Sequence, residues 1–288
     1  MPSLLRSCAI ALLSAVIPLV ATVPARAQNA GRAPLAAPAA PVATYADVAD
    51  LADSARLVAR VAVRGLARVP DARAAGLLPG TGRFLVRART VALLSGDAEL
   101  GESLRYLVDL PLDARGRPPA LKKREVFVFA RLVPGRPDEL QLVARDAQLP
   151  WDAVTETRLR AILSELAAPG APGGVSGVRE IIHVPGTLAG EGETQIFFTT
   201  WDNSAASATV RHVPGQPPAW GVSFSELLAD VGNPPRAETL AWYRLACFLP
   251  NAVPRGANHS EDPAARQQAE NDYRMLLGEL GACPRSRR

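Results

Sequence analysis

The strongest constraint on the fold is an alternation of apolar and charged residues in the first half of the chain. Across Leu57–Val69 every odd position is small or apolar, while Arg60, Arg64 and Arg68 occupy even positions. A helix would also gather these arginines into a stripe. The valines and Gly65 favour a strand, because β-branched residues and glycine lower helix stability.

The same period of two returns at Phe84–Ala88 and Leu104–Leu110, and two further strand-like runs follow at Lys123–Val133 and Leu140–Ala144. Gly- and Pro-containing turn signals separate the runs. The segment Lys123–Val133 is apolar on both faces, so we expect it to be central. Five strands of this length predict a small, closed or partly open barrel of the OB type.

Residues 45–145 resemble, in this strand rhythm, the secreted netrin-like and metalloprotease-inhibitor modules, which are built on an OB-type barrel. The inhibitor family acts through an N-terminal cysteine. Here Gln28 begins the expected mature chain, so the resemblance implies the barrel and no inhibitory function.

Residues 1–27 have the features of a secretory signal peptide. Arg6 provides the positive region, Cys8–Val23 the apolar region, and Ala25-Arg26-Ala27 the cleavage pattern. The apolar run is shorter than the roughly 20 residues of a spanning helix, and Pro18 interrupts it. We therefore expect cleavage near Ala27 and no transmembrane segment in the mature chain.

Composition points to the Gram-negative periplasm. Lys122 and Lys123 are the only lysines, and the abundance of Arg, Ala, Gly and Pro is typical of a GC-rich bacterial genome. Cleavage removes Arg6 and Arg26 from 32 basic residues, which leaves 30 against 28 acidic residues. The resulting charge of +2 is too small to indicate a nucleic-acid partner.

The expected mature chain keeps two cysteines, Cys247 and Cys283. An even pair in an oxidising compartment predicts a disulfide. A redox or metal pair would need C-x-x-C spacing or nearby histidines, and the sequence has neither.

The sequence predicts an α+β chain in two modules. Thr44 should cap a short helix with Val48 and Leu51 inward, and Asp152 should cap a helix that buries Val154, Leu159 and Ile162. The proposed organisation is a signal peptide at 1–27, a flexible Ala/Pro-rich leader at 28–43, an OB-like module at 44–168, a linker at 169–177, and an α+β module at 178–288.

The second module should contain an antiparallel sheet followed by helices. We expect strands at Val178–Val184, Gln195–Trp201, Ala206–Val213 and Ala219–Phe224, and helices near Ser225–Val231, at Ala237–Phe248, and from Asp262-Pro263 to a cap at Gly281. The strings Leu240–Pro250 and Gly221–Glu226 resemble exported Gram-negative proteins of unknown function, a resemblance that implies no activity.

Catalytic and metal motifs are weak. His183 and His212 could form a zinc site with Glu180 or Asp202 if their strands were neighbours, but no ligand-spacing motif supports one, and we predict no metal and no cofactor. An exported hydrolase with residues from distant segments, for example Ser223, His212 and Asp202, is the alternative function, because triads are defined by geometry.

The candidate ligand-binding residues are arginines. If the first two strands pair, one sheet face carries Arg60, Arg64, Arg87 and Arg89, with Arg105 close to them on the third strand. Guanidinium groups suit phosphate and carboxylate ligands, although a merely solvated outer face would show the same pattern. We predict a non-enzymatic binding or envelope-interaction protein whose partner is an envelope polyanion or another periplasmic protein.

Overall fold

The computed structural model describes residues 43–96, 99–227 and 231–287. The predicted signal peptide and nearly all of the predicted leader lie outside these residues. The elements in chain order are α1 (Tyr45–Ser54), β1 (Leu57–Arg68), the 3-10 helix η1 (Asp71–Arg73), β2 (Thr81–Ser95), β3 (Ser103–Pro111), β4 (Glu125–Val133), β5 (Arg136–Leu142), β6 (Gln148–Pro150), α2 (Ala153–Leu166), β7 (Val175–Pro185), β8 (Gly192–Thr200), β9 (Ser207–His212), β10 (Ala219–Ser223), α3 (Leu240–Ala246) and α4 (Pro263–Leu280).

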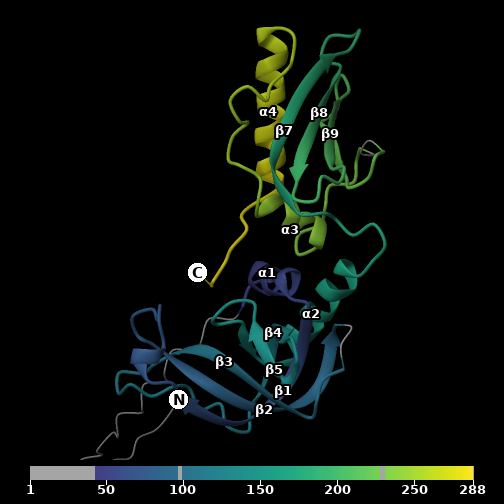
Figure 1. Ribbon diagram of the computed structural model, residues 1–288. Helices are drawn as coiled ribbons and strands as arrows, with labels where there is room; N and C mark the ends of the chain where they lie inside the picture. The colour runs from purple at the N-terminus through teal and green to yellow at the C-terminus, as the bar shows by residue number, and fades with distance from the viewer. Residues whose placement is uncertain (1–42, 97–98, 228–230, 288) are drawn as a thin grey trace, which may run out of the picture. The chain divides into compact units, whose positions relative to one another are not determined.

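The first sheet closes on itself into a barrel (Figure 1). The strand order is β1-β2-β3-β5-β4, and β4 pairs again with β1. Every pair is antiparallel except β3 and β5, which run parallel. The short strand β6 adds to β4 beside β5. This confirms the predicted α+β fold with a five-stranded, OB-like barrel module.

The alternation that predicted the strands also fills the barrel. Inward positions form one buried apolar cluster, which includes Val61 and Val63 of β1, Val86 of β2 and Val108 of β3. The strand β4 is buried on both sides, as expected, because Val128 faces this cluster whereas Phe127 packs in the other core.

The second sheet has the order β10-β9-β8-β7 and is antiparallel throughout. Its four strands match the four predicted segments to within a few residues. The helix α4 packs along β7, as Figure 1 shows. Its predicted caps are present, since Asp262 accepts from the backbone N–H groups of Ala264 and Ala265, and Gly281 has the left-handed φ of 71°.

Three local expectations differ from the structure. Val154 is 70% exposed, because α2 turns its buried face through Thr155, Leu159 and Ile162 instead. Residues 224–227 form a bend, so no helix begins at Ser225 in the described part of that segment. The three-residue strand β6 was not expected, since it is too short to show a period.

Helix α1 joins the two sheets in one core. Thr44 and Asp47 form a capping box, in which each side chain bonds the other's backbone N–H. The buried Val48 and Leu51 belong to a cluster that also contains Phe127 of β4 and residues of β7, β8, β9 and α4. Burial of apolar area is the main stabilising term in such a junction.

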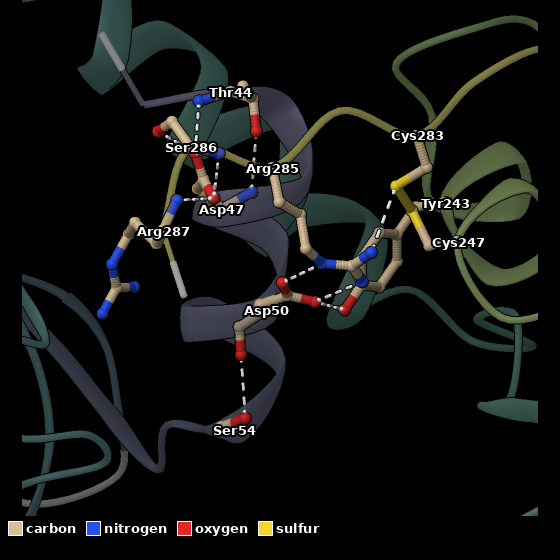
Figure 2. A network of polar contacts seen from close by, with 10 residues as sticks. All are labelled: Thr44, Asp47, Asp50, Ser54, Tyr243, Cys247, Cys283, Arg285, Ser286 and Arg287. Atoms are coloured by element: carbon tan, nitrogen blue, oxygen red, sulfur yellow. Dashed lines mark hydrogen bonds and ion pairs between the residues drawn. A yellow bond between two sulfur atoms is a disulfide. The ribbon is translucent and has the colours of Figure 1, made fainter. Parts of the chain in front are cut away.

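The chain end returns to α1 (Figure 2). Asp47 accepts hydrogen bonds from the Ser286 hydroxyl at 2.5 Å and from the backbone N–H groups of Ser286 and Arg287. One turn further along, Asp50 accepts from Arg285 at 2.7 Å and from the Tyr243 hydroxyl at 2.7 Å.

The predicted disulfide between Cys247 and Cys283 is present, with sulfur atoms 2.00 Å apart. It ties the segment after α4 to the end of α3, directly before the residues that bind α1 (Figure 2). Asp53 adds a further tie, because it forms a two-pronged ion pair with the buried Arg244 of α3.

The Asp47 network predicts a pH dependence of stability. Burial raises the pKa of the Asp47 carboxyl, but hydrogen bonds from Ser286, Thr44 and Arg287 outweigh burial and lower its pKa from 3.8 to about 2. A carboxyl with a lowered folded-state pKa stabilises the protein above its unfolded pKa, and this contribution is lost as the pH falls from about 4 to 2.

We therefore expect Asp47→Asn to lower the free energy of unfolding by roughly 2 kcal/mol at pH 7, measured by urea denaturation. The wild type should lose this difference between pH 4 and 2, whereas the variant should not. The exposed Asp71 supplies the control substitution Asp71→Asn. Parallel stability curves for the wild type and D47N would contradict the prediction.

Candidate functional site

The four predicted arginines all lie on the outer face of the barrel, on β1 and β2. Arg64, Arg87 and Arg89 are exposed and Arg60 is partly buried. The register continues the face onto β3, because Arg87 lies opposite Arg105. The structure thus brings these side chains to one surface, but it gives them different surroundings.

Arg60 is occupied by other protein groups. Its Nη1 donates to Glu156 at 2.9 Å, and its Nε lies 3.5 Å from a carboxylate oxygen of Glu125. The guanidinium also stands over the ring of Trp151, 5.3 Å from the ring centroid. With two carboxylates beside it, Arg60 is poorly placed to serve a ligand.

Arg64 occupies a β-bulge. Val63 pairs with Ala88 and Gly65 with Arg87, so Arg64 has no partner residue on β2. An extra residue of this kind bends the strand and redirects a side chain. The Arg87 guanidinium reaches across to β1, since its Nη2 lies 3.5 Å from the position that a Cβ on Gly65 would take.

A hollow of about 350 Å³ lies at this point, and its walls include Arg64, Arg87, Arg105, Ser103 and Asp138. Within the described residues, neither Arg64 nor Arg87 forms an ion pair. Arg105 is paired with Asp138 at 2.6 Å. The hollow therefore holds two guanidinium groups without an ion pair, and the carboxylate in its wall, Asp138, is bound by Arg105.

A larger hollow of about 650 Å³ adjoins the first one, and Arg105 lines both. Leu85 and Leu107 stand opposite each other on β2 and β3, and they are 37% and 49% exposed. Beyond them Arg83 and Asp109 form a two-pronged ion pair with distances of 2.7 and 2.8 Å. This hollow is lined mainly by apolar groups. Asp109 neutralises Arg83, whereas Arg145, which also lines the hollow, donates to the carbonyl of Gly76.

Arg89 lies beyond this pair of hollows. Its Nη1 donates weakly to the carbonyl of Thr90 at 3.4 Å, and its side chain does not line either hollow. The sequence identified the arginines from their alternation, but it did not identify Leu85 and Leu107. Their positions opposite each other are visible only once the register of β2 and β3 is known.

The second sheet holds a separate polar cluster, in which His183 and His212 meet Asp272 and Thr194 in place of the Glu180 or Asp202 considered from the sequence. Asp272 of α4 is buried and accepts hydrogen bonds from Thr194 of β8, from His212 Nε2 at 2.9 Å and from Gln268 at 2.8 Å. His183 Nδ1 lies 2.8 Å from the Thr194 hydroxyl oxygen. Because that hydroxyl donates to Asp272, the His183 ring donates to it.

These contacts hold both imidazoles in defined orientations beside a hollow of about 320 Å³. The His183 ring packs against Gly192, where a larger residue would not fit, because a Cβ at that position would lie 2.7 Å from His183 Cε1. Burial lowers the pKa of His183, and His212 lowers it further, whereas Asp272 and Asp262 act in the opposite direction. A sequence signal existed in Asp272, a charged residue on the apolar face of α4.

The example triad Ser223, His212 and Asp202 does not come together. Ser223 pairs with Ser207 on β9, five residues before His212, which is a distance of about 16 Å along a strand. The Ser223 hydroxyl contacts Ser225, and Asp202 accepts from Ser204. His212 is held by Asp272 instead.

The described residues contain no group of three or more His, Cys, Asp or Glu side chains placed to hold a metal ion. Across the same residues, no helix combines the length and apolar character needed to cross a bilayer. Comparison with known proteins finds no family model that matches the chain and no curated protein that matches it significantly.

The burial of His183 predicts that stability falls in mild acid. Its folded-state pKa lies below the value of about 6.5 in an unfolded chain. As the pH drops through 6.5, the unfolded chain therefore takes up a proton that the folded protein does not, and the free energy of unfolding decreases.

His183→Gln should flatten the dependence of the melting temperature on pH between 7.5 and 5.5, because the variant cannot take up this proton. The exposed His259 gives a matched control, and His259→Gln should retain the wild-type slope. An unchanged slope in H183Q would show that His183 does not govern this range.

Proposed function

We propose that this protein is an exported, non-enzymatic binding protein whose barrel takes an anionic ligand of the cell envelope. The observation that carries the proposal is the pair Arg64 and Arg87, two guanidinium groups from adjacent strands that line one hollow without a carboxylate partner among the described residues. Guanidinium groups bind phosphate and carboxylate oxygens with two parallel hydrogen bonds.

The position of the hollow supports the same proposal. It lies on the outer face of strands β1 to β3 of an OB-like barrel. In such barrels the face of the second and third strands commonly binds oligonucleotides and oligosaccharides. Fold alone does not define a ligand, so the proposal depends on the unpaired charges.

Charge at the neighbouring positions limits the ligand. Arg60, Arg83 and Arg105 are each bound to carboxylates of the protein. Arg64, Arg87 and Arg89 form no ion pair within the described residues, and of these three only Arg64 and Arg87 line the hollow. This favours recognition of one or two anionic groups over a long polyanion that would follow the whole sheet.

Export to the periplasm is the second part of the proposal. It is supported by the signal-like residues 1–27 and by the disulfide between Cys247 and Cys283, because disulfides persist mainly in oxidising compartments.

Expression of the full chain in a Gram-negative host should give a periplasmic protein whose N-terminal residue is Gln28, determined by mass spectrometry. The same spectrum should show Cys247 and Cys283 oxidised. A cytoplasmic protein that keeps residues 1–27 would contradict export.

The alternative, an exported hydrolase, gains one supporting feature in the imidazoles of His183 and His212 beside a hollow. The hydroxyl that contacts His183 is that of Thr194, and it already donates to Asp272. It is therefore a support for the cluster and not an available nucleophile. The binding function is accordingly our proposal.

The double substitution Arg64→Glu with Arg87→Glu should abolish anion binding. Inorganic polyphosphate is a suitable first probe, measured by calorimetry and by thermal shift. The loss of two charge-assisted contacts should lower the affinity by a factor of at least about 100. The wild-type affinity should fall as salt is added.

The matched control is Arg255→Glu with Arg274→Glu, two exposed arginines outside the barrel that give the same change in net charge. This variant should bind as the wild type does. An equal loss of affinity in both variants would show that net charge, and not the hollow, governs binding. A wild type that does not bind polyphosphate would contradict the proposed function.

A further inference from the structure

We infer that the ligand of the barrel face is a single amphiphilic molecule, with a phosphate or carboxylate head on Arg64 and Arg87 and an apolar tail over Leu85 and Leu107. This inference rests on the proposed function and names the chemical class of its ligand. It follows from the way in which apolar and cationic groups are divided between two adjoining hollows.

The two hollows are continuous in the sheet register. Arg87 pairs with Arg105, and Leu85 pairs with Leu107, two positions along the same strands. Side chains two positions apart point to the same face, about 7 Å from each other. If the head of a ligand binds the arginines, the part of the ligand that follows the head therefore lies over the two leucines.

The leucines are unusual for an outward position on this face. Leu85 is 37% exposed and Leu107 is 49% exposed. On each strand, the leucine lies between two charged residues that point to the same face. Single exposed apolar residues need no explanation, but this cross-strand pair lines a hollow of about 650 Å³, together with Leu140, Leu142 and Val143. Ligand cavities commonly measure about 300–1,000 Å³ and are mostly apolar with a few polar groups.

The charge distribution gives the ligand a direction. At the far side of the leucines, Arg83 is neutralised by Asp109 through two hydrogen bonds. On the near side, Arg64 and Arg87 have no such carboxylate within the described chain, and Arg105 between the two hollows is balanced by Asp138. The larger hollow also contains the exposed Arg145, whose guanidinium donates to the carbonyl of Gly76. The single charged head is assigned to the smaller hollow because two guanidinium groups without an ion pair lie there, whereas Arg145 stands alone and is already bound by a carbonyl.

The size of the hollow favours one molecule over a membrane surface. A bilayer would need a broad cationic or apolar area, whereas here the two arginines without an ion pair in the smaller hollow and the apolar groups of the larger one line concave sites. The occupant that we propose is a monomeric amphiphile, taken out of solution or out of a membrane.

A series of soluble alkyl phosphates tests this directly, with the full chain in its oxidised form. The probes are inorganic phosphate and butyl, hexyl and octyl phosphate, all used below the concentration at which they form micelles. Affinity should rise about fourfold for each methylene that is buried, which corresponds to about 0.8 kcal/mol. Vesicles of phosphatidylglycerol form a separate arm.

Two variants separate the head from the tail. Leu85→Gln with Leu107→Gln should remove most of the dependence on alkyl length and leave polyphosphate binding unchanged. Arg64→Glu with Arg87→Glu should remove binding of the whole series. The control Leu188→Gln, at a leucine that is 63% exposed in the second sheet's β7–β8 loop, should behave as the wild type, and circular dichroism verifies that each variant is folded.

The outcomes distinguish this inference from the proposed function. Polyphosphate binding that needs Arg64 and Arg87, with no effect of alkyl length, would overturn the amphiphile and keep the anion-binding function. Alkyl phosphates that bind equally to the arginine variant would overturn both. Binding to vesicles without binding to octyl phosphate would indicate a membrane surface and would also overturn the inference.

Discussion

The double pairing of β1 is the constraint on which the barrel and its candidate site depend. β1 pairs with β2 over Val58–Arg68 and with β4 over Leu57–Ala62, and this second pairing closes the sheet. A strand with partners on both edges must bend to follow a closed wall. Three irregularities interrupt the register of β1 with β2, two with the extra residue on β2 and one with the extra residue on β1, and bulges are the usual means of such bending. One of them contains Arg64, so the device that closes the barrel also places the first arginine of the proposed site.

The ion pairs of the barrel decide which arginines are available. An arginine on a solvated strand gains little from a single surface partner, but a neighbouring carboxylate cancels its field at a short distance. Arg60, Arg83 and Arg105 each have such a neighbour. What distinguishes Arg64 and Arg87 is therefore the identity of the residues around them. Gly65 and Ala88 on the adjacent positions bring no carboxylate to the hollow.

The alternation of apolar residues predicted the strands because inward and outward positions along a strand follow a fixed period. Helix caps at Thr44, Asp152 and Asp262 were predictable for a similar reason, since each is a local hydrogen bond between near neighbours. The disulfide followed from counting cysteines.

Contacts between distant segments were not predictable in this way. The pairing of Arg60 with Glu156, 96 residues away, and of His212 with Asp272, 60 residues away, depends on which strands and helices become neighbours. Leu85 and Leu107 have the same explanation, because neither is unusual until the register places them side by side.

The core that joins the two sheets leaves the proposed site uncovered. Phe127 and Phe129 of β4 turn away from the barrel interior and pack in the cluster that includes α1, α2, α3 and the second sheet. Leu94 of β2 and Leu142 and Val143 of the larger hollow pack against this cluster. The exposed Arg64, Arg87, Leu85 and Leu107 are not part of it. The residues that stabilise the junction, such as Asp47 and Arg244, are thus separate from the arginines and leucines proposed to bind the ligand. Because distant sites without shared partners contribute independently to stability, substitutions on the barrel face can be interpreted as effects on binding, and those in the junction as effects on folding.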